Sequence, residues 1–145
     1  MSDTQDALIQ LARDAATQNV LDPATVCAVC EKESTWNPWA VRFEPAFYDR
    51  YTKPMHLTDT EEYTRAISWG LMQIMGETAR EFGFVARFVS GLCDPATGLL
   101  YGCLKLKRCF DNAGGDTSIA LSHYNGGGDA SYPGDVMSRI AKYQL

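Results

Sequence analysis

The chain has 145 residues, which is long enough for one domain with a single core and too short for two independent domains. Hydrophobic residues make up 46% and charged residues 21%, a balance typical of a globular protein, and no apolar run approaches the roughly 20 residues of a membrane span. The formal net charge of −5 argues against a nucleic acid as partner, because polyanion binding normally rests on a basic surface. We expect a monomer with one domain over residues 1–145, no nucleic acid partner and no membrane insertion.

The N-terminal segment is polar and acidic and leads into a helical pattern. Residues 1–6 lack the basic start and apolar run of a secretory signal, so we expect synthesis in a cytoplasm without a signal peptide. Apolar side chains then recur at helical spacing, which predicts an amphipathic helix over residues 4–19.

A second helix is predicted to begin at Asp22, which can cap its N-terminus and is followed by a proline. Small and β-branched residues follow, which indicates that this helix is mostly buried. The Asn-Pro pair at 37–38 ends the stretch, because the residue before a proline is disfavoured in the α region. Glu33 therefore lies in the last turn of a buried helix or directly after it.

The middle of the chain has a weaker pattern. Residues 39–60 mix aromatic, charged and proline residues without a period, which predicts an irregular segment with one helical turn near residues 46–51. A short helix is expected over residues 59–67. The run at 70–75 is expected to turn directly into a further helix that ends at Gly83.

The C-terminal part again shows clear helix signals. Asp94-Pro95 repeats the pattern of a cap followed by proline, and an apolar face predicts the longest helix from there to a stop at Gly114-Gly115. Asp116 can cap another helix through Tyr124, and a last one is expected over residues 134–143. Six or seven helices with no convincing strand predict an all-α domain.

The five cysteines cannot all pair within the chain, and the odd number favours reduced thiols. Cys27 and Cys30 have the spacing of a redox or metal motif, but no second Cys/His pair stands at zinc-site spacing, so we expect two buried residues on a helix. His56 and His123 are single, and the sequence predicts neither a metal nor an organic cofactor. The cysteines are Cys27, Cys30, Cys93, Cys103 and Cys109.

Glu33 has the surroundings that acid catalysis at a glycosidic bond requires. Such a carboxyl must donate a proton, and an apolar environment raises its pKa so that some acid survives near neutral pH. Small apolar residues precede Glu33 and Trp36 follows it, although Lys32 would lower its pKa if the two side chains met.

The run Gly70-Leu-Met-Gln-Ile-Met75 begins 37 positions after Glu33 and is unusual as pure core. A buried Gln73 needs hydrogen-bond partners, and a cleft would supply them. Its amide can form hydrogen bonds with sugar hydroxyl and N-acetyl groups, while methionine offers an adaptable apolar surface for a pyranose ring. The run is predicted to line a cleft or, alternatively, to belong to the core.

Four motifs then occur in order along the chain: Glu33-Ser34-x-x-Asn37-Pro38-x-Ala40, Gly70-Leu71-Met72-Gln73-Ile74-Met75 with Thr78-Ala79, Asp94-Pro95, and Tyr124-Asn125-Gly126-Gly127. Together they resemble the soluble lytic transglycosylase-like (SLT) domain of the lysozyme superfamily, over about residues 24 to 130. The resemblance implies a lysozyme-like all-α fold of the goose-type lysozyme and SLT kind, and it implies peptidoglycan glycan strands as the partner.

The resemblance also implies roles for individual residues. Glu33 looks like the single catalytic acid/base, and Tyr124 like the tyrosine that orients its carboxyl. The residues that the resemblance and the cleft argument assign to substrate binding are Ser34, Ser68, Gln73, Met75, Asn125 and Glu44.

The chain departs from the family pattern between the first two motifs. The usual serine nine positions after the glutamate is Arg42 here, and about 20 extra residues separate the motifs. Ser68 is the candidate to replace the missing hydroxyl. Glu44 is expected either to bond the site or to pair with Arg42. The inserted segment resembles variants in phage cell-wall enzymes, so an endolysin that is made in a host cytoplasm and acts on the cell wall is expected.

The reaction implied is that of a lytic transglycosylase. Glu33 would protonate the oxygen of the MurNAc–GlcNAc β-1,4 bond and later accept the proton of the muramyl 6-hydroxyl, which leaves 1,6-anhydro-MurNAc ends. One carboxyl suffices for this, whereas most glycoside hydrolases use two. The possible second carboxylates are Asp49, Glu44, Asp94 and Asp129. A hydrolytic muramidase (lysozyme) and a non-catalytic glycan-binding virion module are therefore the alternatives.

Overall fold

Capping side chains fix the starts of the long helices. The computed structural model describes residues 2–145. α1 (Asp3–Gln18) begins after Ser2, whose hydroxyl accepts the N–H of Gln5. Three more helices begin after an aspartate that accepts the N–H three residues on: α2 (Pro23–Ser34) after Asp22, α6 (Pro95–Asn112) after Asp94, and α7 (Thr117–Asn125) after Asp116. These starts confirm the predicted caps, and Glu33 lies in the last turn of α2 as predicted.

The last helix, α8 (Tyr132–Tyr143), begins two residues before the start expected from the sequence. α6 has 18 residues and is the longest helix among the described residues, as predicted. Gly114 and Gly115 follow it with positive φ angles, which confirms the expected stop at this glycine pair.

A small sheet forms where no strand was expected. β1 (Val41–Phe43), β2 (Ile67–Trp69) and β3 (Ile74–Met75) pair antiparallel in the order β1-β2-β3. Strands of two or three residues are too short to give a readable alternation, so the expectation of no strand was wrong in this segment. The run at 70–75 is a turn followed by β3, and only then does α5 (Gly76–Glu81) begin.

The segment before α4 (Asp59–Arg65) is helical over a longer stretch than the single turn predicted. α3 (Pro45–Phe47) continues into a π-helical turn, η1 (Tyr48–Thr52), and a 3₁₀ turn, η2 (Lys53–Met55). The predicted short helix at 59–67 corresponds to α4, which ends two residues earlier because β2 begins at Ile67.

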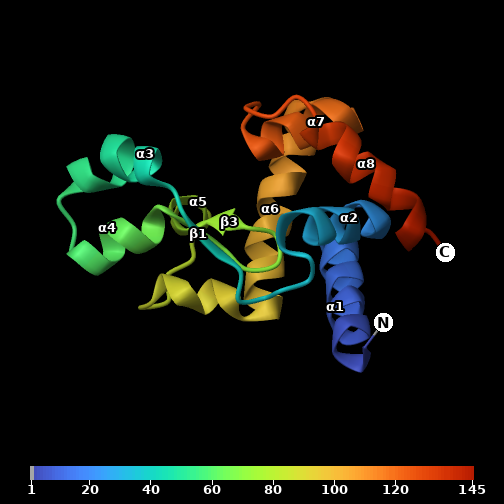
Figure 1. The fold of residues 1–145 in the computed structure, drawn as a ribbon, viewed down its shortest axis with the longest axis horizontal. Helices are drawn as coiled ribbons and strands as arrows, with labels where there is room; N and C mark the ends of the chain where they lie inside the picture. Colours follow the sequence, from blue (N-terminus) through green and yellow to red (C-terminus); the bar gives the residue numbers. More distant parts are fainter. Residues whose placement is uncertain (1) are drawn as a thin grey trace.

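Figure 1 shows α6 between two groups of elements: α1, α2, α7 and α8 on one side, and α3, α4, α5 and the sheet on the other. We call these groups the helical lobe and the sheet lobe. Each has its own buried cluster: the first is built around α2 and α6, and the second includes Trp69, Ile74 and Leu92. The helical class predicted from the sequence is confirmed.

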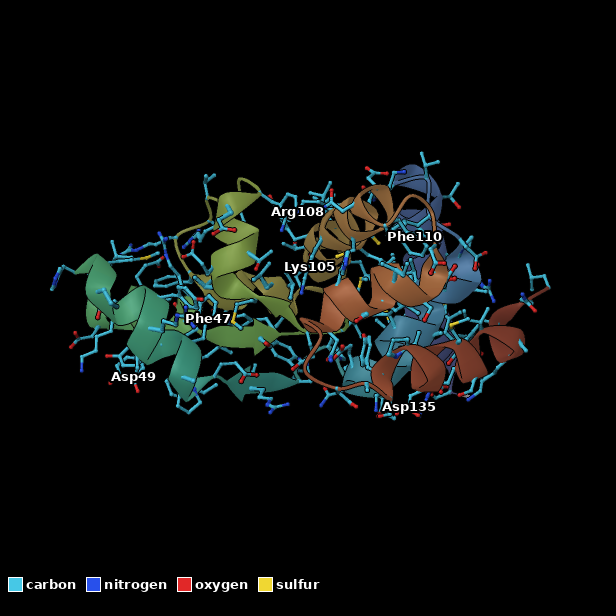
Figure 2. The ribbon with its side chains drawn as sticks, turned by 90° about the horizontal axis from the view of Figure 1, so that it is seen from above. Phe47, Asp49, Lys105, Arg108, Phe110 and Asp135 are labelled. Carbon is cyan, nitrogen blue, oxygen red and sulfur yellow. The ribbon has the colours of Figure 1, made fainter. Side chains whose placement is uncertain are left out.

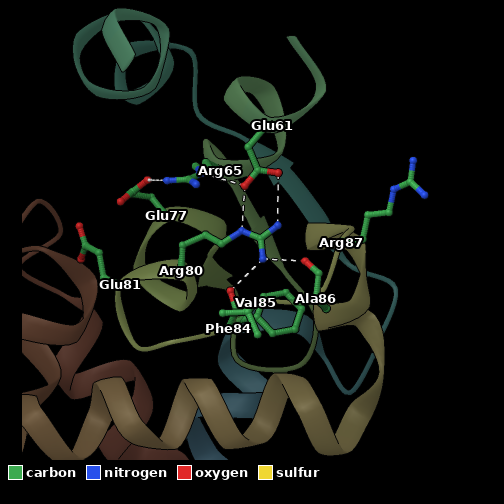
Figure 3. A pocket seen from close by; sticks show the side chains of 9 residues that line it. All are labelled: Glu61, Arg65, Glu77, Arg80, Glu81, Phe84, Val85, Ala86 and Arg87. Atoms are coloured by element: carbon green, nitrogen blue, oxygen red, sulfur yellow. Dashed lines mark hydrogen bonds and ion pairs between the residues drawn. The ribbon is translucent and has the colours of Figure 1, made fainter. Parts of the chain in front are cut away.

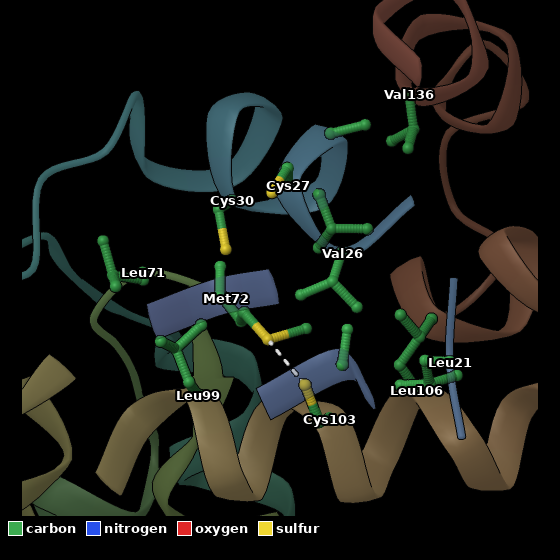
Figure 4. Packing of buried hydrophobic residues seen from close by; sticks show 14 of the residues in the cluster. Leu21, Val26, Cys27, Cys30, Leu71, Met72, Leu99, Cys103, Leu106 and Val136 are labelled. Carbon is green, nitrogen blue, oxygen red and sulfur yellow. Dashed lines mark hydrogen bonds between the residues drawn. The ribbon is translucent and has the colours of Figure 1, made fainter. Parts of the chain in front are cut away.

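The core between α2 and α6 is rich in sulfur (Figure 4). Met72 inserts from the turn after β2, and its Sδ lies 4.0 Å from Sγ of Cys103. All five cysteines are buried, and none of them forms a disulfide in this structure. Burial raises the pKa of Cys27 to about 11 and that of Cys103 to about 12, so neither is a thiolate near neutral pH. The thiols of Cys27 and Cys30 are therefore packing groups, as expected.

In the sheet lobe, an ion-pair network occupies a hollow of about 510 Å³ next to α4 and α5 (Figure 3). Arg80 Nε lies 2.8 Å from Glu61 Oε1, and Arg80 Nη1 donates to the carbonyl oxygens of Phe84 and Ala86. Arg65 bridges Glu61 and Glu77. The polar groups thus satisfy one another and stabilise the loop before η3 (Val89–Cys93). No helix among residues 2–145 is both long and apolar enough to cross a bilayer.

Candidate active site

A cleft of about 670 Å³ opens between the two lobes. Its walls come from α2, from all three strands and the α3–η1 segment, and from α6, α7 and the glycine turn after α7. Figure 2 shows two of its lining residues, Phe47 on the α3 side and Lys105 on α6. The cleft brings together residues that lie far apart in the sequence: Glu33, Arg42, Glu44, Ala46, Phe47, Arg50, Tyr51, Ser68, Gln73, Met75, Lys105, Tyr124, Asn125, Gly128 and Asp129.

Glu33 presents a partly buried carboxyl to this cleft. Burial raises its pKa above the ordinary value, while the hydrogen bond from Tyr132 and the charges of Lys105, Lys32 and Arg42 act in the opposite direction. Burial outweighs them, so a larger share of the carboxyl stays protonated near neutral pH than for an exposed glutamate. The Lys32 ammonium forms an ion pair with Asp135 at 3.5 Å, which weakens the effect of Lys32 on the pKa of Glu33.

The tyrosine that contacts Glu33 is Tyr132, at the start of α8. Its hydroxyl donates to Glu33 Oε1 at 2.7 Å, and its ring is buried. The hydroxyl of Tyr124 instead donates to the carbonyl oxygen of Met72 at 2.6 Å. The role assigned to Tyr124 therefore needs correction: α7 buries its side chain toward the turn after β2, and Tyr132 makes the contact with Glu33.

Lys105 lies beside these groups on α6. Its ammonium donates to the carbonyl oxygen of Tyr124 at 2.8 Å and stands 4.2 Å from the centre of the Tyr124 ring. Burial lowers the pKa of Lys105, and the charge of Glu33 partly restores it. Sequence reasoning missed Lys105 because it belongs to the apolar-patterned helix α6, and it missed Tyr132 because the helix was expected to start two residues later.

Two of the proposed substrate-binding residues have backbone partners. The Gln73 side-chain nitrogen donates to the carbonyl oxygens of Ala40 and Gly70, at 2.9 and 3.0 Å. Its side-chain oxygen remains for a ligand in the cleft. The hydroxyl of Ser34 lies within 3.0 Å of the carbonyl oxygens of Cys30 and Leu71, and Ser34 does not line the cleft. Ser34 therefore ties the end of α2 to the turn after β2.

The remaining proposed residues line the cleft. Ser68 stands directly opposite Arg42 in the register of β1 and β2, which places a hydroxyl on the neighbouring strand beside the position where the family has serine. Glu44 Oε1 lies 3.2 Å from Arg42 Nε, so the ion pair expected as one option for Glu44 is present. Met75 and Asn125 complete the set.

Among the possible second carboxylates, Glu44 and Asp129 line the cleft, whereas Asp49 and Asp94 do not. Asp49 lies on the outer side of the α3–η1 segment in Figure 2. Asp94 is used as the cap of α6. Hydrogen bonds from Ser131 hold the pKa of Asp129 below its ordinary value, so this carboxylate is ionised in the cleft.

Comparisons with known proteins show what the chain is similar to. The family model described as the transglycosylase SLT domain matches residues 10–133. A protein of Enterobacteria phage PRD1 described as a transglycosylase is 31% identical over 134 residues, which cover 87% of this chain and 40% of that relative. The chain thus spans about two fifths of the length of this curated relative. No solved structure gives a significant match. Because the family model covers most of the chain and every residue that lines the cleft, the chain belongs to the transglycosylase SLT domain family.

Proposed function

We propose that this chain is a peptidoglycan lytic transglycosylase whose general acid/base is Glu33. The observation that carries the proposal is a carboxyl with a raised pKa, held by Tyr132 and lying in the cleft between the lobes. General acid catalysis requires the carboxyl to be protonated near the working pH and within reach of the leaving oxygen. Family membership supports peptidoglycan as the substrate that brings such an oxygen.

The reaction begins when protonated Glu33 donates its proton to the oxygen of the MurNAc–GlcNAc β-1,4 bond. That bond breaks, and the carbonyl oxygen of the muramyl N-acetyl group stabilises the anomeric carbon. The carboxylate of Glu33 then accepts the proton of the muramyl 6-hydroxyl, whose oxygen bonds to the anomeric carbon. Glu33 returns to its acid form, no water is consumed, and the new end is a 1,6-anhydro sugar.

The cleft residues support this reaction by holding the glycan. The free side-chain oxygen of Gln73 can accept a hydrogen bond from a sugar hydroxyl or N-acetyl N–H. The Met75 side chain offers an adaptable apolar surface for a pyranose face. We assign binding roles to Ser68 and Asn125 because they also line the cleft. We assign Ser34 and Tyr124 to support of the turn after β2, which carries Gln73.

Hydrolysis is the second candidate, because Asp129 supplies an ionised carboxylate in the same cleft as Glu33. Asp129 could hold a water in an inverting mechanism, in which two carboxyl groups flank the bond. Glu44 is less suited, since Arg42 neutralises it. The two reactions differ by one water at the new chain end, which mass spectrometry of digested peptidoglycan separates.

We also propose a role in host lysis by a phage, since the relative is a phage protein with the same type of domain. The enzyme would then act on the cell wall after synthesis in the host cytoplasm. The relative is longer than this chain, so its additional parts carry no information about the partners of this one.

Tyr132→Phe is expected to lower kcat/KM on peptidoglycan by about tenfold, because the partly buried hydrogen bond that fixes the Glu33 carboxyl is lost. That bond lowers the pKa of Glu33, so its removal raises the pKa further. The alkaline limb of the pH profile reports loss of the protonated acid, and it is therefore expected to move to higher pH. Initial rates of wall solubilisation across pH measure both effects.

Tyr124→Phe is the matched control, since it also deletes one buried phenol oxygen near the cleft but one that bonds Met72. It is expected to reduce stability and to leave the alkaline limb in place. If Tyr124→Phe shifts the limb and Tyr132→Phe does not, the assignment of the two tyrosines is reversed.

A further inference from the structure

One wall of the cleft is a helical face that the family motifs do not include. Ala46, Phe47, Arg50 and Tyr51 all line the cleft, and their spacing places them on one side of the α3–η1 segment. Figure 2 shows Phe47 on the inner side of this segment. We call these four residues the α3–η1 wall.

Aromatic packing fixes the opposite side of the segment. The Tyr48 ring stacks on Tyr63 of α4 with centroids 4.5 Å apart and planes 7° apart. The ring of Phe43 in β1 packs against both, with its centroid 5.8 Å from that of Tyr48 and 5.7 Å from that of Tyr63. Thr52 is fully buried. The α3–η1 segment is therefore anchored to α4 and β1, and the wall lines the same cleft as Lys105 and Asn125.

Among residues 2–145, Arg50 is the basic side chain of this cleft that has neither an ion pair nor a hydrogen-bond partner. Three basic side chains line it; Arg42 pairs with Glu44, and Lys105 donates to the carbonyl oxygen of Tyr124. Among residues 2–145, Arg50 makes no ion pair, and its guanidinium carbon stands 5.1 Å from the centre of the Tyr51 ring. A cation exposed in a cleft of a chain with net charge −5 is placed to bind an anion.

The aromatic side chains beside Arg50 indicate that the bound anion also carries apolar groups. Phe47 and Tyr51 pack together with centroids 4.8 Å apart and form an apolar surface beside the guanidinium. An extended chain that carries both methyl groups and carboxylates matches a surface of this kind. In peptidoglycan the peptide stem has this chemistry: it branches from the lactyl group of each muramic acid and carries alanine methyls and free carboxylates, whereas the sugar backbone itself is uncharged.

We propose that the α3–η1 wall binds the peptide stem of the substrate, with Arg50 paired to a stem carboxylate and the Phe47–Tyr51 surface against its alanines. This inference rests on the proposed function, because it assumes that a glycan strand occupies the cleft. It makes the enzyme selective for strands that bear acidic stems, and it gives the inserted segment a role in substrate choice.

The test uses soluble fragments of GlcNAc and MurNAc that carry the peptide stem with its carboxylates either free or amidated. Binding is measured by calorimetry in an E33Q background, which prevents cleavage. The E33Q protein is expected to bind the free-acid fragment about tenfold more tightly than the amidated one, as for one charge-assisted hydrogen-bonded pair. Adding R50Q is expected to reduce the ratio to about twofold or less without changing affinity for the amidated fragment, and R50K is expected to keep most of it.

R87Q is the matched control. Arg87 is also an exposed arginine that is followed in the sequence by an aromatic residue, and its guanidinium carbon lies 5.2 Å from the centre of the Phe88 ring. It differs from Arg50 in that it lines the hollow of the sheet lobe. R87Q is expected to leave the ratio unchanged. Equal loss of affinity for both fragments in R50Q, or an unchanged ratio, would overturn the inference. Wild-type protein that leaves glycan strands uncut while the ratio depends on Arg50 would overturn only the proposed function.

Discussion

Glu33→Gln is expected to lower kcat on purified peptidoglycan by about a thousandfold, the range that a positioned general acid contributes. The amide keeps the shape of the side chain and its acceptor for the Tyr132 hydroxyl, but it has no acidic proton for the leaving oxygen. Release of soluble fragments from labelled cell walls measures the loss.

The fold of this variant is expected to be intact. A carboxyl whose pKa is raised by folding opposes folding as the pH rises through the unfolded and then the folded pKa. Replacing it with a neutral amide therefore leaves stability at neutral pH equal or higher. Thermal unfolding of both proteins checks this.

Glu31→Gln serves as the matched control for Glu33→Gln. Glu31 lies one half-turn away on α2, where it pairs with Arg139 and Lys142 of α8 instead of lining the cleft. Its variant is expected to retain turnover. If Glu33→Gln clears cell walls as fast as wild type, Glu33 has no catalytic role, and a glycan-binding module becomes the better account.

Gly70→Ala is expected to destabilise the protein by about 3 kcal/mol. Gly70 has a φ of +73°, and an added Cβ would lie 2.8 Å from the carbonyl oxygen of Leu92. The strain would fall on the turn that carries Gln73, since the carbonyl oxygen of Gly70 accepts a hydrogen bond from the Gln73 amide. Activity is therefore expected to fall together with stability. Chemical denaturation measures the free energy of unfolding.

Gly83→Ala separates the cost of the positive φ angle from the cost of the close contact with Leu92. Gly83 also has a positive φ, of +98°, but no atom lies within 4 Å of an added Cβ. Its variant is expected to lose only about 1 kcal/mol, the cost of the left-handed backbone. A Gly70→Ala variant no less stable than Gly83→Ala would show that the contact with Leu92 relaxes without cost.

Local signals were sufficient for the helices. Each aspartate before a proline or a helix-forming run fixes a helix start by its own hydrogen bond, so Asp22, Asp94 and Asp116 could be read without tertiary information. The strands could not, because β1 pairs with β2 across more than 20 positions, as between Arg42 and Ser68, and β2 and β3 are too short to show an alternating pattern.

The sequence indicated several of the residues that line the cleft, but it did not indicate which side chains contact one another there. Glu33, Gln73 and Met75 line the cleft because the motif turn after β2 packs against the end of α2. The contact of Tyr132 with Glu33 depends on how α8 crosses α2, which is a property of tertiary packing and leaves no local pattern. The same holds for Arg50: its place in the wall depends on the aromatic stack between Tyr48 and Tyr63.

The chemical structure of the cut chain ends distinguishes transglycosylation by Glu33 alone from hydrolysis. Purified peptidoglycan is digested with wild-type protein, with Glu33→Gln as the blank, and the released fragments are analysed by mass spectrometry. If Glu33 acts alone as acid and base, the muramyl ends are 1,6-anhydro sugars, each lighter by one water than a reducing end. Hydrated reducing ends from the wild type would contradict this account and favour hydrolysis with a second carboxylate.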